Sequence, residues 1–289
     1  MKTFPPSELL INDDGSIFHL HLKPEFLADK IILVGDPDRV QMISSYFDQV
    51  ECTVANREFH TATGTYKGKR ITVVGTGIGT DNIDIVVNEL DALANIDLKT
   101  RTEKEEFRQL TFVRIGTSGA VQPDLKPGTF VMAEKSIGFD GVLNFYANRD
   151  SVCDLEFEKA FTQQVDWLHQ WCAPYVIDND AELLNRIGQN DMVRGVTISA
   201  NGFYGPQGRE LRLALAHPTL NDKLETFRYQ GYRITNYEME SSAIAGLGKL
   251  MGHKAMTVCC IIANRRVHDA FTNYKAAIRE LVEKVLDRI

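Results

Sequence analysis

Apolar residues gather in short runs that alternate with longer helical patterns along the chain. Six runs rich in β-branched residues predict strands, and several lack polar alternation, as strands covered on both faces do. These runs span residues 31–35, 71–75, 112–116, 129–133, 193–199 and 257–263. Apolar side chains at three- and four-residue spacing predict helices at roughly 81–95, 155–171, 208–216, 239–251 and 274–288. Strands that alternate with helices favour an α/β fold.

Neither a Pro/Gly/Ser-rich linker nor an internal repeat divides the 289 residues. We therefore predict a single domain over 1–289, in which residues 1–17 form an N-terminal extension. The charged segment 99–109 (KTRTEKEEFRQ) lies between a predicted helix and a predicted strand. We expect a solvated insertion there, with a contact between subunits as the alternative.

Charge and composition narrow the classes of function. The 32 basic and 39 acidic residues give a net charge of −7, and 44% of the residues are hydrophobic. This balance is ordinary for a folded globular protein. It argues against nucleic acid or an anionic membrane as a partner, because both attract positive charge. A phosphate site in such a chain must gather a few arginines locally.

The cysteines and histidines predict no metal site. The five cysteines include no Cys-x-x-Cys pair, and the seven histidines form no close pair on a predicted helix, although His19 and His21 alternate as on a strand. The N-terminus has no apolar signal-peptide core, and an uninterrupted apolar run of about 18 residues is absent. We therefore expect reduced thiols, a cytoplasmic location and no membrane contact.

Two glycine turns follow predicted strands in the first third of the chain. In the first, Gly35 to Arg39 (GDPDR), a close backbone turn and a guanidinium suit a phosphate. The alternative is a helix-capping turn with Arg39 exposed to solvent. The second turn, GTGIG at 75–79, fails the dinucleotide pattern because position 80 is Thr. We interpret it as a turn that leaves room for a substrate or a facing strand.

A third turn, RIGTSGA at 114–120, places an arginine inside an apolar strand that ends in small and hydroxyl-bearing residues. Arg114 lies on the same strand face as Gly116. A buried guanidinium needs a partner because an unpaired buried charge is costly. A bound anion shared with Arg39 is the favoured partner, and a salt bridge to a carboxylate is the alternative.

Two further segments supply groups for a polar ring and a sugar. Phe203, Gln207 and Arg209 provide an aromatic face, an amide and donors, which suit a flat ring with carbonyls flanking an N–H group. Glu240 is suited to vicinal hydroxyls and Met239 to the apolar face of a sugar. Alternatively, the acidic residues complement the dipole of the following helix.

Together these segments resemble the nucleoside phosphorylase family, in its pyrimidine-specific branch. The resemblance runs from about Phe18 to the C-terminal helix, in the family's order and approximate spacing. It implies a three-layer α/β sandwich with a central mixed sheet flanked by helices. The matching segments are GDPDRV at 35–40, NREF at 56–59, TGIG at 76–79, RIGTSGA at 114–120, FYGPQGR at 203–209, NYEMES at 236–241 and NR at 264–265.

The resemblance also implies roles for individual residues. The phosphate ligands are Gly35, Arg39, Arg114, Thr117 and, donated by a neighbouring subunit, Arg57. The ribose ligands are Thr117, Glu238, Met239, Glu240 and, from the same neighbour, His19 beside Phe18. The base ligands are Phe203, Gln207, Arg209, Ile262 and Arg265. Among them, Arg209, Gln207, Arg114 and Glu240 carry the catalytic roles.

The implied reaction is reversible phosphorolysis of uridine to uracil and ribose 1-phosphate, a pentosyl transfer in pyrimidine salvage. Purine members of the family carry an aspartate near the base, whereas 261–265 here reads IIANR. Uracil is therefore favoured, and thymine stays open because a methyl group changes discrimination by only about 1–3 kcal/mol. The alternatives are another base specificity, a nucleosidase that uses water, an inactive nucleoside-binding protein and a nicotinamide-dependent oxidoreductase.

The chain also departs from the family pattern. Gly-Pro replaces Pro-Gly at 205–206, and both the segment 99–109 and the N-terminal arm add length. The resemblance implies a homo-oligomer, at least a dimer, with shared active sites and no cofactor beyond phosphate as co-substrate. At the family's site for a monovalent cation, Glu58 and Ile78 match, but Asn82 stands where serine is expected.

Overall fold

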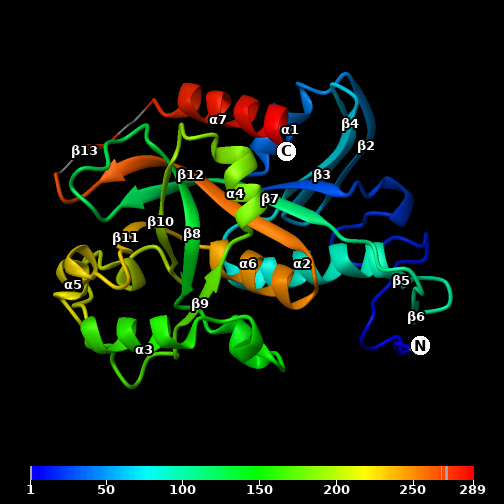
Figure 1. The fold of residues 1–289 in the computed structure, drawn as a ribbon. Coiled ribbons are helices and arrows are strands. Elements are labelled where there is room, and N and C mark those ends of the chain that lie inside the picture. Colours follow the sequence, from blue (N-terminus) through cyan, green and yellow to red (C-terminus); the bar gives the residue numbers. More distant parts are fainter. Residues whose placement is uncertain (1, 268, 271–272) are drawn as a thin grey trace.

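The computed structural model describes residues 2–267, 269–270 and 273–289. Within them the chain folds into a large mixed β-sheet with helices on both faces (Figure 1). This confirms the predicted α/β fold. The main strands are β1 (Lys30–Val34), β2 (Gln49–Asn56), β3 (Phe59–Tyr66), β4 (Lys69–Gly75), β7 (Thr111–Ala120), β8 (Phe130–Gly138), β9 (Tyr175–Asp178), β10 (Val193–Ser199), β11 (Ile234–Glu238), β12 (Lys254–Asn264) and β13 (Asp269–Ala270).

The helices and minor elements connect these strands. The α-helices are α1 (Asp38–Ser44), α2 (Thr80–Asn95), α3 (Leu155–Gln164), α4 (Ala181–Gly188), α5 (Leu220–Thr226), α6 (Ser241–Leu250) and α7 (Lys275–Arg288). A separate hairpin consists of β5 (Ile96–Asp97) and β6 (Thr102–Glu103). Short 3₁₀ turns lie at Pro24–Phe26, Val142–Phe145, Arg149–Ser151 and Gly205–Gln207. None of the described helices is both long and apolar enough to cross a membrane.

The sheet curls at one end. Its strand order is β13-β12-β8-β10-β11-β7-β1-β4-β3-β2, with β9 paired to β8. In addition, β12 pairs in parallel with β7, so β7, β11, β10, β8 and β12 close into a ring. The other strands, β1, β4, β3 and β2, extend the sheet away from this ring. The sandwich that the resemblance implies is therefore closed on one side, as the natural twist of strands favours.

Each face of the sheet is covered by its own set of helices. Helices α2 and α6 lie on one face, and α1, α4 and α7 lie on the other (Figure 1). The buried side chains of these two sets belong to two separate clusters. Phe112 and Val113, adjacent on β7, point into the two opposite clusters because successive strand residues alternate. The predicted strands are thus buried on both sides, as their lack of polar alternation indicates.

Most of the predicted elements are confirmed. All six strands form, and 193–199 has the same bounds as β10. Helices also form at 80–95, 241–250 and 275–288. The last of these, α7, buries the apolar stripe that its spacing predicts, which consists of Ile278, Leu281, Val282, Val285 and Leu286.

Three local predictions are wrong. The helix expected over 155–171 ends at Gln164, because Asp166 takes a left-handed backbone (φ 50°) and turns the chain. No helix forms over 208–216, where Gly208 is also left-handed (φ 67°) and Leu213 is 84% exposed. His19 lies in a turn instead of a strand, because the carboxylate of Glu89 accepts its backbone N–H.

The charged insertion, residues 99–109, contacts the N-terminal extension, residues 1–17. Residues 99–109 are largely exposed, as predicted, but they are not free of contacts. Thr3 forms a β-bridge with Thr102, and the N–H of Phe4 donates to the carbonyl of Arg101 at 2.8 Å. Lys104 Nζ donates to the carbonyl of Ala94 at 2.8 Å, at the carboxyl end of α2. The two segments that depart from the family pattern therefore form one surface unit.

Replacing the fully buried Phe112 by Ala should lower the free energy of unfolding by about 3–5 kcal/mol, the usual cost of emptying a buried aromatic site. The matched control is Phe145→Ala, because Phe145 is 90% exposed and its loss should cost no more than about 0.5 kcal/mol. Denaturant unfolding measures both values. Similar losses for the two variants would contradict this placement of the core.

Candidate active site

The segments singled out in the sequence meet at one edge of the sheet. Strands β1, β4, β7 and β12 run parallel, so their carboxyl ends lie together. The end of β11 meets the end of β7 in antiparallel pairing, with Tyr237 opposite Gly119. Gly35 follows β1, and the turn at 75–79 follows β4. Strand ends in open α/β sheets commonly carry the ligand site.

Arg114 is the buried centre of this edge. Its guanidinium lies between two carboxylates, with Nη1 at 3.2 Å from Glu238 Oε2 and Nη2 bonded to Glu240 Oε2. A Cβ on Gly116 would lie 2.1 Å from Nη1, so glycine is required there to make room. Of the two partners weighed from the sequence, the carboxylate contacts are present in the structure. We call Arg114, Glu238 and Glu240 the arginine clamp.

The carboxylates of the clamp also hold the turns around them. Glu240 Oε1 accepts the backbone N–H of Gly79 at 2.8 Å, where Gly79 has the positive φ of 99° that glycine tolerates. Burial raises the pKa of Glu240, although Arg114 opposes that shift. Glu240 therefore joins the turn after β4 to the start of α6 and faces the same space as Arg114.

Arg39 adds a second cation beside the clamp. It lies in the first turn of α1, and its side chain makes no hydrogen bond or ion pair with any residue that the structure describes. Burial lowers the pKa of Arg39, and the nearby Arg114 lowers it further. Nε of Arg114 and Oγ of Ser118 are likewise buried without a partner in the described chain. Such a group of donors suits an oxyanion.

A second polar group lies on the loop after β10. Gln207 is buried, and its Oε1 accepts a hydrogen bond from Arg209 Nη1 at 2.6 Å. The guanidinium of Arg209 stacks over the ring of Phe203, 3.8 Å from its centroid. Burial, followed by the neighbouring Arg265, lowers the pKa of Arg209 to about 10, so the side chain stays charged at neutral pH.

A small cavity of about 110 Å³ connects this group to the end of β7. Arg265 donates to the backbone carbonyls of Gln207 and Gly208 and so holds the loop in place. The cavity is lined by Gly119, Ala120, Val121, Gln207, Arg209, Asn221, Tyr237, Arg265 and Arg266. Gly119 and Ala120 lie at the end of β7, the strand that also carries Arg114 and Thr117. The Gln207–Arg209 pair and the clamp therefore both lie near the end of this strand.

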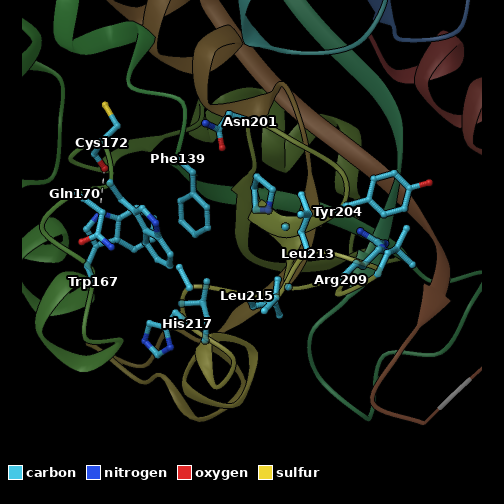
Figure 2. Close-up of a pocket in the computed structure, with 18 of the residues that line it drawn as sticks. Phe139, Trp167, Gln170, Cys172, Asn201, Tyr204, Arg209, Leu213, Leu215 and His217 are labelled. Carbon is cyan, nitrogen blue, oxygen red and sulfur yellow. Dashed lines mark hydrogen bonds between the residues drawn. The ribbon is translucent and has the colours of Figure 1, made fainter.

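A larger apolar cavity of about 780 Å³ lies behind the same loop (Figure 2). Trp167 and Phe139 line one side and Arg209 the other, with Leu213 and Leu215 between them. The smaller cavity is lined by Gly119 and Tyr237, which lie on the strands that carry Arg114 and Glu238, whereas the larger one is lined by neither strand. We therefore place the chemistry at the smaller cavity. Sequence reasoning missed the larger cavity, because Leu211, Leu213 and Leu215 stand about 40 residues from Trp167 and Trp171 and meet them only in the fold.

Phe18, His19 and Arg57 form a separate outer group. Arg57, in the turn between β2 and β3, lies over the ring of Phe18 at 5.6 Å. His19 Nδ1 pairs with Glu89 at 2.6 Å. Among the described residues, neither a hydrogen bond nor an ion pair links this group to Arg39 or the clamp.

Two other sets of predicted residues are placed as follows. Met239 lies half-buried inside the clamp segment, and Ile262 lies half-buried on β12. At the predicted cation site, Glu58 and Asn82 both flank Gly77, and Ile78 is exposed. Within the described residues there is no group of three or more His, Cys, Asp or Glu side chains arranged for a metal ion.

Comparison with known proteins decides the family. Residues 29–289 match the model described as the phosphorylase superfamily. The chain belongs to the phosphorylase superfamily. It is 30% identical over 273 residues to the uridine phosphorylase of Thermococcus kodakarensis, covering 92% of this chain and 83% of that protein. It is also 30% identical over 253 residues to the uridine phosphorylase of Escherichia coli, covering 87% of each.

A solved structure of a superfamily member resembles this fold throughout. It is a nucleoside phosphorylase of Trypanosoma brucei, described as showing uridine phosphorylase activity. The TM-score is 0.85 at 27% identity, with 97% of this chain and 99% of that chain covered. The matched region starts at residue 29, so Phe18 and His19 lie outside the superfamily model, whereas Arg39, the clamp and the loop after β10 lie inside it.

Replacing Arg39 by Gln should weaken the binding of inorganic phosphate about 10- to 100-fold, because a hydrogen bond to a charged group contributes roughly 1.5–3 kcal/mol. Isothermal titration with phosphate measures the change. The control is Arg233→Gln, since Arg233 lies outside the cluster and pairs with Asp124 at the surface. Unchanged phosphate affinity in the Arg39 variant would remove this arginine from the anion site.

Proposed function

We propose that the chain catalyses the reversible phosphorolysis of uridine to uracil and ribose 1-phosphate. The observation that carries the proposal is the combination of the arginine clamp and Arg39 with the Gln207–Arg209 pair at neighbouring strand ends. The first group suits phosphate and ribose hydroxyls, and the second suits a pyrimidine. The relatives named uridine phosphorylase support the same activity.

In this mechanism phosphate itself attacks the anomeric carbon, so no side chain acts as a nucleophile. The C–N glycosidic bond breaks as the C–O bond to phosphate forms, and the bonding electrons leave with uracil. Catalysis then depends on holding a dianion and a nucleoside in line. Arg39 and Arg114 bind the phosphate, Thr117 lies beside phosphate and ribose, and Glu240 accepts hydrogen bonds from the 2′- and 3′-hydroxyls.

The base end of the site stabilises the leaving group. Negative charge grows on the uracil carbonyls as the bond stretches, and Arg209 and Gln207 supply donors to them. No described residue accepts a hydrogen bond from Nε2 of Gln207, so this group can donate to the base while Oε1 accepts from Arg209. The segment 261–265 offers no acid to protonate a purine nitrogen, which favours uracil as the base.

We also propose that the active enzyme is a homo-oligomer, at least a dimer. Phe18, His19 and Arg57 are grouped apart from the clamp in their own chain. A neighbouring copy that presents this outer group would add Arg57 to the phosphate and His19 to the ribose. The proposed enzyme acts in pyrimidine salvage in the cytoplasm, with phosphate as co-substrate and no other cofactor; a monovalent cation would bind near Glu58.

A panel of nucleosides tests the activity. We expect base release from uridine, with weaker release from thymidine and little from cytidine, adenosine or inosine, and we expect it only with phosphate present. Uracil release that proceeds equally without phosphate would indicate a nucleosidase. Tight uridine binding without any release would indicate an inactive binding protein.

Replacing Arg209 by Ala should lower kcat for uridine about 10²- to 10³-fold, because a single electrostatic donor to a developing anion commonly contributes this much. The matched control is Arg212→Ala, since Arg212 lies on the same loop but lines only the larger cavity. Steady-state kinetics measure both variants. A kcat in the Arg209 variant within threefold of the wild-type value would contradict the role in leaving-group stabilisation.

The raised pKa of Glu240 predicts an acid limb in kcat/KM for uridine. Burial stabilises the protonated form, so on lowering the pH Glu240 protonates above 4.5, the ordinary value for glutamate, and accepts hydroxyl donors less well. Arg114 and Glu238 are the charged groups that face it. A pH profile of the wild type and of Glu240→Gln measures the limb, and an unchanged limb in the variant would contradict this assignment.

A further inference from the structure

The carboxylate of Glu238 is engaged entirely by the protein. Its Oε1 accepts from Ser199 Oγ at 2.5 Å and from the backbone N–H of Ser241 at 3.0 Å. Its Oε2 accepts from the backbone N–H groups of Glu240 and Ser241, each at 2.9 Å, and lies 3.2 Å from Arg114 Nη1. A carboxylate has about four acceptor positions. The side chain therefore has no capacity left for a ribose hydroxyl.

These contacts show that Glu238 supports other residues of the site instead of facing a substrate. It accepts the first N–H groups of α6, which have no partner within the helix itself, and so fixes the backbone that carries Glu240. It also fixes one side of the Arg114 guanidinium, while Glu240 takes the other side. Glu240 differs because, among the described residues, its carboxylate accepts hydrogen bonds from Gly79 and Arg114 while Glu238 lies close by, which leaves acceptor positions for substrate.

Ser199 holds Glu238 in this arrangement. It is fully buried at the end of β10, and its hydroxyl donates to Glu238 while accepting the N–H of Ser242 at 2.8 Å. One hydroxyl thus joins β10, β11 and the start of α6. Ser242 is equally buried, but its own hydroxyl donates to Asp140 at 3.1 Å and accepts from Tyr175 at 3.0 Å.

We propose that Glu238 is a positioning residue that sets the phosphate-facing guanidinium of Arg114, that Ser199 orients Glu238, and that of the two glutamates only Glu240 binds the ribose hydroxyls. This differs from the expectation that Glu238 is a ribose ligand. The inference rests on the proposed phosphorolysis, since it concerns which residues of the same site serve phosphate binding and which serve ribose binding.

The test compares Glu238→Gln, Ser199→Ala and Glu240→Gln. For each variant we would measure KM for phosphate and the ratio of kcat/KM for uridine to that for 2′-deoxyuridine. Glu238→Gln should raise the phosphate KM about 10-fold or more, and Ser199→Ala should raise it less, because each removes hydrogen bonds to a charged group. Both should keep the uridine to 2′-deoxyuridine ratio within twofold, whereas Glu240→Gln should lower it towards one.

Ser242→Ala is the matched control for a general disturbance of α6, and it should leave both quantities within twofold of the wild type. A collapse of the nucleoside ratio in Glu238→Gln, equal to that in Glu240→Gln, would overturn the proposal. So would an unchanged phosphate KM in folded variants. If Glu238→Gln does not fold, the phosphate KM and the nucleoside ratio of Ser199→Ala alone decide whether the proposal stands.

The wild type separates this proposal from the proposed function. Wild-type protein without phosphorolysis would refute the function. The positioning role would then be judged by titrating inorganic phosphate into the same variants. Weaker phosphate binding in Glu238→Gln and Ser199→Ala than in Ser242→Ala would support it, and equal binding would overturn it.

Discussion

The arginine clamp is the interaction on which the site depends. Burying a guanidinium is costly unless carboxylates and hydrogen bonds compensate it, and removing one partner of such a group leaves an unpaired buried charge. Arg114 is compensated from two sides, by Glu238 and Glu240. The same carboxylates accept hydrogen bonds from the turn after β4, from the end of β10 and from the start of α6. One buried charge on β7 therefore fixes these three segments, which are distant from it in the sequence.

The same arrangement explains how an acidic chain can bind phosphate. The net charge of −7 describes the whole molecule, whereas Arg39 and Arg114 lie together at one strand edge. With both carboxylates ionised, the clamp carries a net charge of −1, and Arg39 beside it brings the group to neutrality. An anion therefore meets directed donors there instead of the negative charge of the whole chain. At the other end of the site, Arg209 and Gln207 are already paired with each other. Such preorganised groups act without large rearrangement during the reaction.

Buried strands and long amphipathic helices could be predicted from the sequence because their pattern is local. The run at 193–199, which is rich in β-branched residues, and the apolar stripe of α7 are examples. The helix predicted over 208–216 is wrong, because Gly208 turns the chain and the leucines of this segment line a cavity together with Trp167 and Phe139, which are distant in the sequence.

The site residues also divide into features that are local in the sequence and contacts that depend on the fold. The motifs around Arg39, Arg114, Gln207 and Glu240 could be identified along the chain, but the partners of each side chain depend on the fold. The sequence leaves the partner of Arg114 open, because Glu238 reaches it only through the pairing of the end of β11 with the end of β7. Ser199 carries no signal of its own, and its importance follows only from its contact with Glu238.

The most direct test of the account is ³¹P nuclear magnetic resonance of a reaction containing the protein, uridine and inorganic phosphate. The account predicts that the phosphate signal declines while a ribose 1-phosphate signal grows in equal amount to the uracil released. Uracil release with an unchanged phosphate signal and free ribose as the product would contradict it.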